Sequence, residues 1–171
     1  MRQTHEMTAE QVIEALGLVP LDIEGGLVLE TYRSEARTES GEAAGSAIYY
    51  MLRDDTFSHL HRLTGDEIYH FYLGDPVELV ELTAQGEVRK TVLGSDILNG
   101  QCLQHLVPAG NWQGSHLKEG GRFALLGTTM WPAYRQDGYE HGNAEKLLRE
   151  YPEAAEEIRL LTGKVTGTSE K

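Results

Sequence analysis

The chain has 171 residues, of which 40% are apolar and 25% charged, and its formal net charge is -12. Length and composition are typical of a soluble globular protein, and we expect a single domain over residues 1–163. The acidic balance excludes the clustered Lys and Arg of nucleic-acid binding, and no run approaches the roughly 20 apolar residues of a membrane helix. Cys102 is the single cysteine and no signal-peptide pattern is present, so we expect a cytoplasmic protein.

A short helix is predicted over residues 8–18. Thr8 occupies the N-cap position, Gln11 completes a capping box, and Gly17 supplies a stop signal. The apolar residues between them recur at helical spacing, so one face of this helix is expected to pack against the rest of the protein.

The chain is strand-like from residue 24 to about Met130, with a small polar loop over residues 35–45. Turn-forming residues separate the apolar runs, and no long helix lies between them. This pattern favours an antiparallel sandwich or barrel and excludes a parallel α/β sheet. The expected strands lie within residues 24–34, 46–52, 57–61, 67–74, 77–82, 87–94, 101–108, 113–117 and 122–130.

The C-terminal part changes character. Residues 143–152 and 153–163 are predicted to form two short helices, with Asn143 as an N-cap and Gly163 as a stop. Residues 164–171 show no pattern and are predicted to be a disordered tail.

A histidine-rich hairpin is the strongest candidate for chemistry. His59 and His61 are two residues apart on a predicted strand, so their side chains are expected on the same face. Closure of the hairpin around its turn would place Glu67 opposite both. Two imidazoles and a carboxylate are ligand types that suit a divalent metal such as Zn, Fe, Mn or Ni.

The motifs around this hairpin resemble a known family. The H-x-H pair, followed by Glu67 and then Gly74, resembles the first conserved motif of the cupins, small jelly-roll β-barrels. The segment 108-PAGNWQ-113 resembles their second motif. Its last residue, Gln113, stands where cupins usually have a fourth metal ligand.

Motif order and spacing over residues 8–162 are similar to those of the uncharacterised cupins grouped as "cupin 5". The resemblance implies an all-β fold, an antiparallel double-stranded β-helix (the cupin jelly roll), with a short N-terminal helix and two short C-terminal helices. It also implies a homodimer that pairs through sheet augmentation at the N-terminal strands.

The resemblance implies a metal set of His59, His61, Glu67 and Gln113. Two departures weaken it: a carboxamide oxygen is a poorer ligand than imidazole for Zn or Fe, and five residues separate His61 from Glu67, which is more than the cupin pattern usually has. A bound metal therefore stays one alternative.

In the metal-free alternative the same residues form a polar pocket. A carboxylate near His61 would fix its tautomer and suit it to acid or base work near neutral pH. The resemblance to sugar-nucleotide epimerases of the cupin superfamily implies a histidine and a tyrosine that exchange protons with the substrate. Tyr32, Tyr69 or Tyr72 would be that tyrosine, and we assign catalytic roles to His61, Glu67 and Tyr69.

Other residues near the motifs are candidates for ligand contacts or for structure. Trp112 is either an aromatic wall at the pocket mouth or a core residue. His70 lies by alternation on the face opposite Glu67, which favours a structural or interface role. The residues expected to contact a ligand are Tyr32, His59, Phe71, Gln101, Trp112 and Gln113.

Three functions follow from these patterns. The first is a small-molecule enzyme, an isomerase, epimerase or lyase that transfers protons on a carbohydrate-like or nucleotide-linked ligand. The second is a ligand-binding or sensor module without turnover. The third is a metal-dependent dioxygenase.

Overall fold

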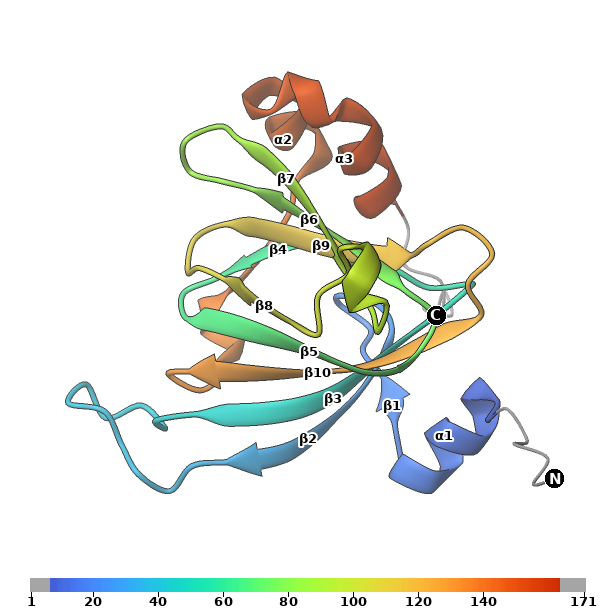
Figure 1. The fold of residues 1–171 in the computed structure, drawn as a ribbon. Helices are drawn as coiled ribbons and strands as arrows, with labels where there is room; N and C mark the ends of the chain where they lie inside the picture. Colours follow the sequence, from blue (N-terminus) through green and yellow to red (C-terminus); the bar gives the residue numbers. More distant parts are fainter. Residues whose placement is uncertain (1–6, 164–171) are drawn as a thin grey trace, which may run out of the picture.

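The protein folds into two antiparallel β-sheets that face each other. The structure is a computed structural model and describes residues 7–163, so the predicted tail over 164–171 lies outside the described residues. One sheet has six strands in the order β1-β2-β3-β10-β5-β8, and the other has five in the order β11-β4-β9-β6-β7 (Figure 1). The all-β jelly roll predicted from the sequence is thereby confirmed.

The six-stranded sheet consists of β1 (Val19–Pro20), β2 (Leu27–Arg33), β3 (Ser46–Arg53), β10 (Phe123–Trp131), β5 (Asp66–Gly74) and β8 (Gln104–Val107). The five-stranded sheet consists of β11 (Tyr139–His141), β4 (Ser58–Leu63), β9 (Trp112–Leu117), β6 (Val77–Leu82) and β7 (Val88–Leu93). The helices are α1 (Ala9–Leu16), α2 (Ala144–Glu150) and α3 (Ala155–Leu161), with 3-10 turns η1 (Ile97–Asn99), η2 (Gln136–Gly138) and η3 (Pro152–Ala154).

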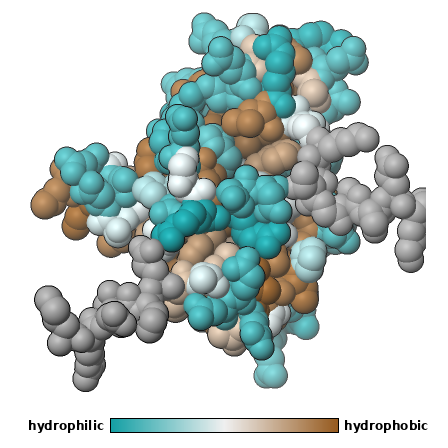
Figure 2. Space-filling view, turned by 90° about the vertical axis from the view of Figure 1, so that its right-hand side faces the viewer, coloured by the Kyte–Doolittle hydropathy of each residue, from teal (hydrophilic) through white to brown (hydrophobic). Residues whose placement is uncertain are grey.

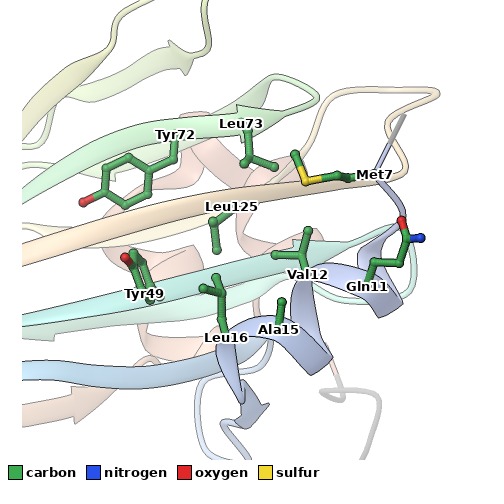
Figure 3. A pocket seen from close by; sticks show the side chains of 9 residues that line it. All are labelled: Met7, Gln11, Val12, Ala15, Leu16, Tyr49, Tyr72, Leu73 and Leu125. Atoms are coloured by element: carbon green, nitrogen blue, oxygen red, sulfur yellow. The ribbon is translucent and has the colours of Figure 1, made fainter. Parts of the chain in front are cut away.

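The N-terminal helix α1 forms as its capping signals predict. The Thr8 hydroxyl accepts from the Gln11 backbone, the Gln11 side chain accepts from the Thr8 backbone, and Gly17 ends the helix in a left-handed conformation. Its apolar face, with Val12, packs on the outer face of the six-stranded sheet around Leu125. A groove of about 720 Å³ runs beside α1, with Tyr49 and Tyr72 at one end (Figure 3).

The C-terminal helices α2 and α3 cover the outer face of the five-stranded sheet (Figure 1). Asn143 caps α2 through the Lys146 backbone, as predicted. Helix α3 begins at Ala155 and not at residue 153 as predicted, because residues from Pro152 form a 3-10 turn before it. The cluster under these helices includes Leu60, Val80, Leu82, Trp112, Leu147, Ile158 and Leu161.

Three sequence expectations about strands need correction. The histidine-rich segment does not form a paired hairpin, because β4 belongs to the five-stranded sheet and β5 to the six-stranded one. Residues 101–103 lie outside β8, and Cys102 makes only an isolated parallel bridge to Leu93. The short strands β1 and β11 were not predicted, because two or three residues are too few to show an alternation of apolar and polar side chains.

Apolar residues on the molecular surface occur in separate places. On the face shown in Figure 2, hydrophilic residues predominate and hydrophobic ones show between them. Such scattered exposure is normal for a globular protein. No helix within residues 7–163 has the length and apolar content that a membrane crossing requires.

Candidate functional site

A cavity of about 210 Å³ lies between the two sheets. Strands of both sheets contribute to its lining, together with the segment that carries Tyr134 and Gln136. The residues that line it are Leu21, Glu24, Val28, Glu30, Ser46, Ile48, Tyr50, His61, Leu63, Glu67, Tyr69, Thr128, Met130, Tyr134 and Gln136. We call this space the interior cavity.

Glu67, Tyr69 and Gln113 form a buried hydrogen-bonded chain beside the interior cavity. The phenol of Tyr69 donates to Gln113 Oε1 over 2.7 Å, and Gln113 Nε2 donates to Glu67 Oε2 over 2.9 Å. Alternation along β5 turns Glu67 and Tyr69 inward, and Gln113 reaches them from β9 in the facing sheet. The chain thus joins the two sheets and fixes the orientation of both cavity-lining groups.

Burial controls the protonation of this chain. Burial raises the pKa of Glu67 and Glu24 raises it further, while nearby His61 and hydrogen bonds from Thr128 and Gln113 oppose the rise. Burial, followed by the charge of Glu67, raises the pKa of Tyr69 well above its ordinary value. Glu67 therefore keeps a proton to higher pH than an exposed carboxyl, and Tyr69 acts as a phenol donor.

His61 faces the interior cavity with a fixed tautomer. Its Nδ1 lies 2.7 Å from the carbonyl oxygen of His59, which can only accept, so Nδ1 carries the proton in the neutral ring. Nε2 is then free to accept a proton, and it lies 4.0 Å from Glu24 Oε1. The ring of Tyr139 stacks on the imidazole with centroids 5.0 Å apart. This arrangement suits a base whose conjugate acid would be stabilised by Glu24.

Glu24 is the main site residue that the sequence did not reveal. Its Oε1 accepts from the Ser58 hydroxyl over 2.7 Å, and its backbone carbonyl accepts from the His59 amide. The turn after it needs glycine: Gly26 has a φ of +75°, and a Cβ there would lie 2.7 Å from the Tyr50 hydroxyl. The turn itself is readable from the paired glycines, but nothing in the sequence signals that it delivers a carboxylate to the cavity.

His59 does not share the cavity with His61, contrary to the alternation expected for an uninterrupted strand. The register of β4 on β9 shifts between Ser58 and His61, which is a β-bulge with one extra residue. His59 instead stacks on His141 with ring centroids 3.7 Å apart, and burial lowers its pKa. The expectation that both imidazoles look into one cavity is therefore wrong for His59.

Five other expected ligand contacts lie outside the cavity lining. Tyr32 faces solvent, because a register shift between Glu30 and Tyr32 interrupts the alternation that puts Val28 and Glu30 at the lining. Phe71 lies deeper, in the apolar core between the sheets. Trp112 belongs to the cluster under α2 and α3, and the guanidinium of Arg62 lies over its ring.

Gln101, the fourth, lies in the turn before β8, where its side-chain oxygen accepts from the Asp96 backbone. Gln113 also lies outside the lining itself, although it contacts Glu67 and Tyr69. Of the sequence-predicted site, the structure thus brings together His61, Glu67 and Tyr69 around the cavity, with Gln113 behind them.

The residues that the cupin resemblance implied as metal ligands do not converge. His59 lies on the other side of β4, and the Gln113 oxygen that would bind a metal already accepts from Tyr69. Within residues 7–163 no three His, Cys, Asp or Glu side chains are grouped as ligands of a metal ion would be. The donor set does not fit the expected metal, and we derive no chemical step from one.

Two further histidines have partners away from the cavity lining. His70 faces outward, as predicted, with Nε2 2.9 Å from the Thr129 hydroxyl and Nδ1 3.1 Å from the Gln104 amide nitrogen. His105 pairs with buried Glu81 over 2.6 Å. Both rings thus have polar partners that hold them in place.

Comparison with known proteins places the chain in a family. Residues 10–142 match the family described as "Cupin superfamily (DUF985)". A crystal structure of a protein from Shewanella oneidensis is 33% identical, with a TM-score of 0.86 over 92% of this chain and 99% of that one. A hypothetical protein from Leishmania major is 29% identical, with a TM-score of 0.83 over 91% of this chain and 98% of that one.

More distant matches show the fold alone. A structure of oxalate decarboxylase from Bacillus subtilis is 13% identical, with a TM-score of 0.52 over 85% of this chain and 39% of that one. A search of curated proteins found no match to the sequence. The family match and the one-third identity over nearly the whole chain confirm the resemblance seen in the motifs, and the chain belongs to the DUF985 family of the cupin superfamily.

Proposed function

We propose that the protein binds a small, carbohydrate-like molecule in the interior cavity and transfers a proton on it, as an isomerase, epimerase or lyase. One observation carries the proposal: His61 and Glu67 both line the interior cavity between the sheets. Their surroundings push them toward different roles, since the neutral His61 ring presents an unprotonated nitrogen and burial raises the pKa of Glu67. Two such groups around one cavity suit general acid–base catalysis.

The proposed step for an isomerase uses both groups on a carbonyl substrate. Nε2 of His61 takes the proton from the carbon next to the carbonyl, and the C–H electron pair forms a carbon–carbon double bond. The carbonyl oxygen receives a proton from Glu67 at the same time, which gives a neutral enediol. His61 then returns the proton to the carbon that carried the original carbonyl. The hydroxyl on the adjacent carbon loses its proton to Glu67 and becomes the new carbonyl, which completes the isomerisation. Glu24, 4.0 Å from Nε2, stabilises the imidazolium between the two steps.

The size of the cavity limits the ligand. Pockets for drug-sized ligands usually measure about 300–1,000 Å³. At about 210 Å³, the interior cavity suits a molecule smaller than a nucleotide. We therefore propose a free monosaccharide-sized ligand for the cavity, and any nucleotide portion would have to remain outside it.

Deuterium exchange tests the proposal without knowledge of the product. The protein is incubated in D2O with a panel of free aldoses and ketoses, and incorporation of deuterium next to the carbonyl is followed by NMR. Loss of a general base typically lowers a rate by about 10²- to 10⁴-fold. We expect this loss for His61→Gln.

His116→Gln is the matched control, because His116 lies beside Glu78 in the five-stranded sheet and outside the cavity lining. We expect this variant to keep the exchange rate of the unmodified protein. Equal exchange by His61→Gln and the unmodified protein would remove His61 from the mechanism. Absence of exchange across the whole panel would count against proton transfer.

A binding module without turnover is the second candidate. It is favoured by Gln113, whose side-chain oxygen and nitrogen are both used by Tyr69 and Glu67 and so act as scaffold. Ligands that raise the melting temperature without any deuterium incorporation would support this candidate over the enzyme. Either role suits the cytoplasm, our proposed location, since Cys102 has no cysteine partner in the chain.

We also propose that two copies pair. The resemblance implied sheet augmentation at the N-terminal strands, and the exposed aromatic residues favour a contact through the outer face of the six-stranded sheet instead. Three aromatic side chains on this face are at least half exposed, Trp131 at 68%, Tyr32 at 60% and Tyr72 at 50%. The outward positions between Ile68 and Tyr72 carry no carboxylate, and burial lowers the pKa of His70, which keeps that ring neutral. In a chain of net charge -12, such a face lets two copies approach with little repulsion.

Light scattering during gel filtration tests the pairing. We expect a dimer mass for the unmodified protein and a monomer mass for Ile68→Glu, which adds charge to the centre of the face. Leu98→Glu is the control, because Leu98 is 93% exposed in η1 away from this sheet face. A monomer mass for the unmodified protein, or a dimer that survives Ile68→Glu, contradicts the proposal.

A further inference from the structure

The lining of the interior cavity has an unbalanced charge. It contains the carboxyl groups of Glu24, Glu30 and Glu67, and no lysine or arginine among the residues that the structure describes. Cavities that accept phosphates or carboxylates normally supply Arg, Lys or backbone amides at a helix N-terminus. The carboxyl groups of this lining suit a positively charged ligand instead.

Glu30 is neutralised from outside the cavity. Arg33 donates to both of its oxygens, over 3.0 and 2.7 Å, and also to the Tyr134 carbonyl over 3.0 Å. The guanidinium directs three of its donors to these partners, and Arg33 is not among the residues that line the cavity. Glu24 and Glu67 remain as the acidic groups that a ligand would meet.

Glu24 gives the cavity a negative field. Its only ion-pair partner among the described side chains is His61, at 4.0 Å. Its charge raises the pKa of Tyr50 and Tyr134, after burial, which is the larger cause for each phenol. An anion in the same space would meet this field with no cation to offset it.

The hydrogen-bonding groups of the lining show the same bias. The three phenols that line the cavity already donate within the protein: Tyr50 to the Gly25 carbonyl, Tyr69 to Gln113, and Tyr134 to Gln136. Their protons are used, so they contribute aromatic rings, whose faces attract cations. Carboxyl oxygens remain as acceptors, and a ligand rich in donors matches them.

We propose that the ligand of the interior cavity is an amine-bearing sugar or a similar small polyol with an ammonium group, and that acidic and phosphorylated sugars are rejected. This inference rests on the proposed small-molecule site and adds its selectivity. The ammonium group would lie beside Glu24, donating up to three hydrogen bonds. The sugar hydroxyls would meet Thr128 and Ser46, which also line the cavity.

A matched series of four probes tests the selectivity: glucosamine, glucose, glucuronate and glucose 6-phosphate. Binding is measured by calorimetry and by melting-temperature shift at about pH 6.5, where the amine is protonated. We expect glucosamine to bind about 10- to 100-fold more tightly than glucose, the gain from a hydrogen bond to a charged group. Glucuronate and the phosphate should bind more weakly than glucose.

Glu24→Gln tests the source of the preference, since glutamine keeps an oxygen for Ser58 but loses the charge. The variant should bind glucosamine and glucose equally. Glu87→Gln, an exposed change in the β6–β7 turn, should keep the preference. A melting curve for each variant shows that it is folded.

The possible results separate this inference from the proposed function. Binding of glucuronate or the phosphate as tight as that of glucosamine overturns the charge selectivity and leaves the small-molecule site standing. Equal binding of glucosamine and glucose, or an unchanged preference in Glu24→Gln, does the same. Failure of all four probes to bind overturns both the inference and the proposed site.

Discussion

The space between the two sheets is divided into two regions of opposite character. One region is filled by hydrocarbon, with Leu52, Phe71, Leu79, Leu93 and Leu126 all buried in a single cluster. The other is the interior cavity, where carboxyl, imidazole and phenol groups meet. The same strands build both regions, so depth along a strand decides whether a residue serves packing or chemistry.

Strand β5 shows this division most clearly. Phe71 packs in the apolar region, Glu67 lines the cavity, and Tyr69 between them contributes a ring to the core and a hydroxyl to Gln113. All three point inward, because they are two residues apart. The apolar region holds the sheets together, which allows the polar region to stay open.

The largest effect is expected in the apolar region. Leu126→Ala should lower the free energy of unfolding by about 2–5 kcal/mol, because Leu126 is fully buried and its loss leaves a cavity. Urea unfolding measures the change. The control is Thr128→Ser, two residues along β10 at the wall of the existing cavity, for which we expect about 1 kcal/mol or less. Equal losses would remove the distinction between the regions.

The boundary between the regions is expected to show an intermediate effect. Tyr69→Phe removes the donor to Gln113 and leaves a buried oxygen without its partner, which should cost about 1–3 kcal/mol. Tyr72→Phe, on the solvent side of β5, should cost about 0.5 kcal/mol or less. The same unfolding measurement compares them, and a Tyr69→Phe protein as stable as Tyr72→Phe would show that the chain from Tyr69 to Glu67 adds no stability.

The smallest effect is a pH dependence in the polar region. Because burial raises the pKa of Glu67 above its ordinary value of 4.5, the unfolded chain releases this proton first as pH rises. The protein should therefore lose stability as the pH rises from about 4.5 through the raised pKa, by about 1.4 kcal/mol for each pH unit that separates the folded and unfolded pKa values. Glu67→Gln should lack this loss, so its free energy of unfolding should rise relative to that of the unmodified protein as the pH increases.

Unfolding curves at several pH values test the dependence, with Glu87→Gln as an exposed control. A constant difference between Glu67→Gln and the unmodified protein across the range would show that the carboxyl is not protonated more readily in the folded state. It would then not serve as the acid of the proposed step.

Much of the fold was readable from the sequence because its signals are local. The capping box at Thr8, the cap at Asn143 and the alternation of β5 depend on neighbours a few residues away. The meeting of His61 and Glu67 at one cavity was predicted for a wrong reason. β4 and β5 do not pair in a hairpin but lie in the two facing sheets, joined by a short turn.

The rest of the site depends on register shifts and on distant segments. The shifts in β2 and β4 each insert one residue, and nothing in the local sequence marks them. For this reason Tyr32 and His59 were wrongly predicted to face the cavity. Glu24 and Tyr134 reach the cavity from segments far apart along the chain, and a single sequence contains no signal for such convergence.

The β-bulge in β4 decides which side chains of this strand turn toward Glu24. Ser58 and His61 both turn toward Glu24 although they are three residues apart, a separation that would send them to opposite sides of a regular strand. The extra residue turns His59 away from the cavity, onto His141. It also lets Ser58 donate to the Glu24 carboxylate on the side that His61 faces. One extra residue in β4 thereby decides that a single imidazole of this strand, and not a pair of them, shares the interior space with Glu24 and Glu67.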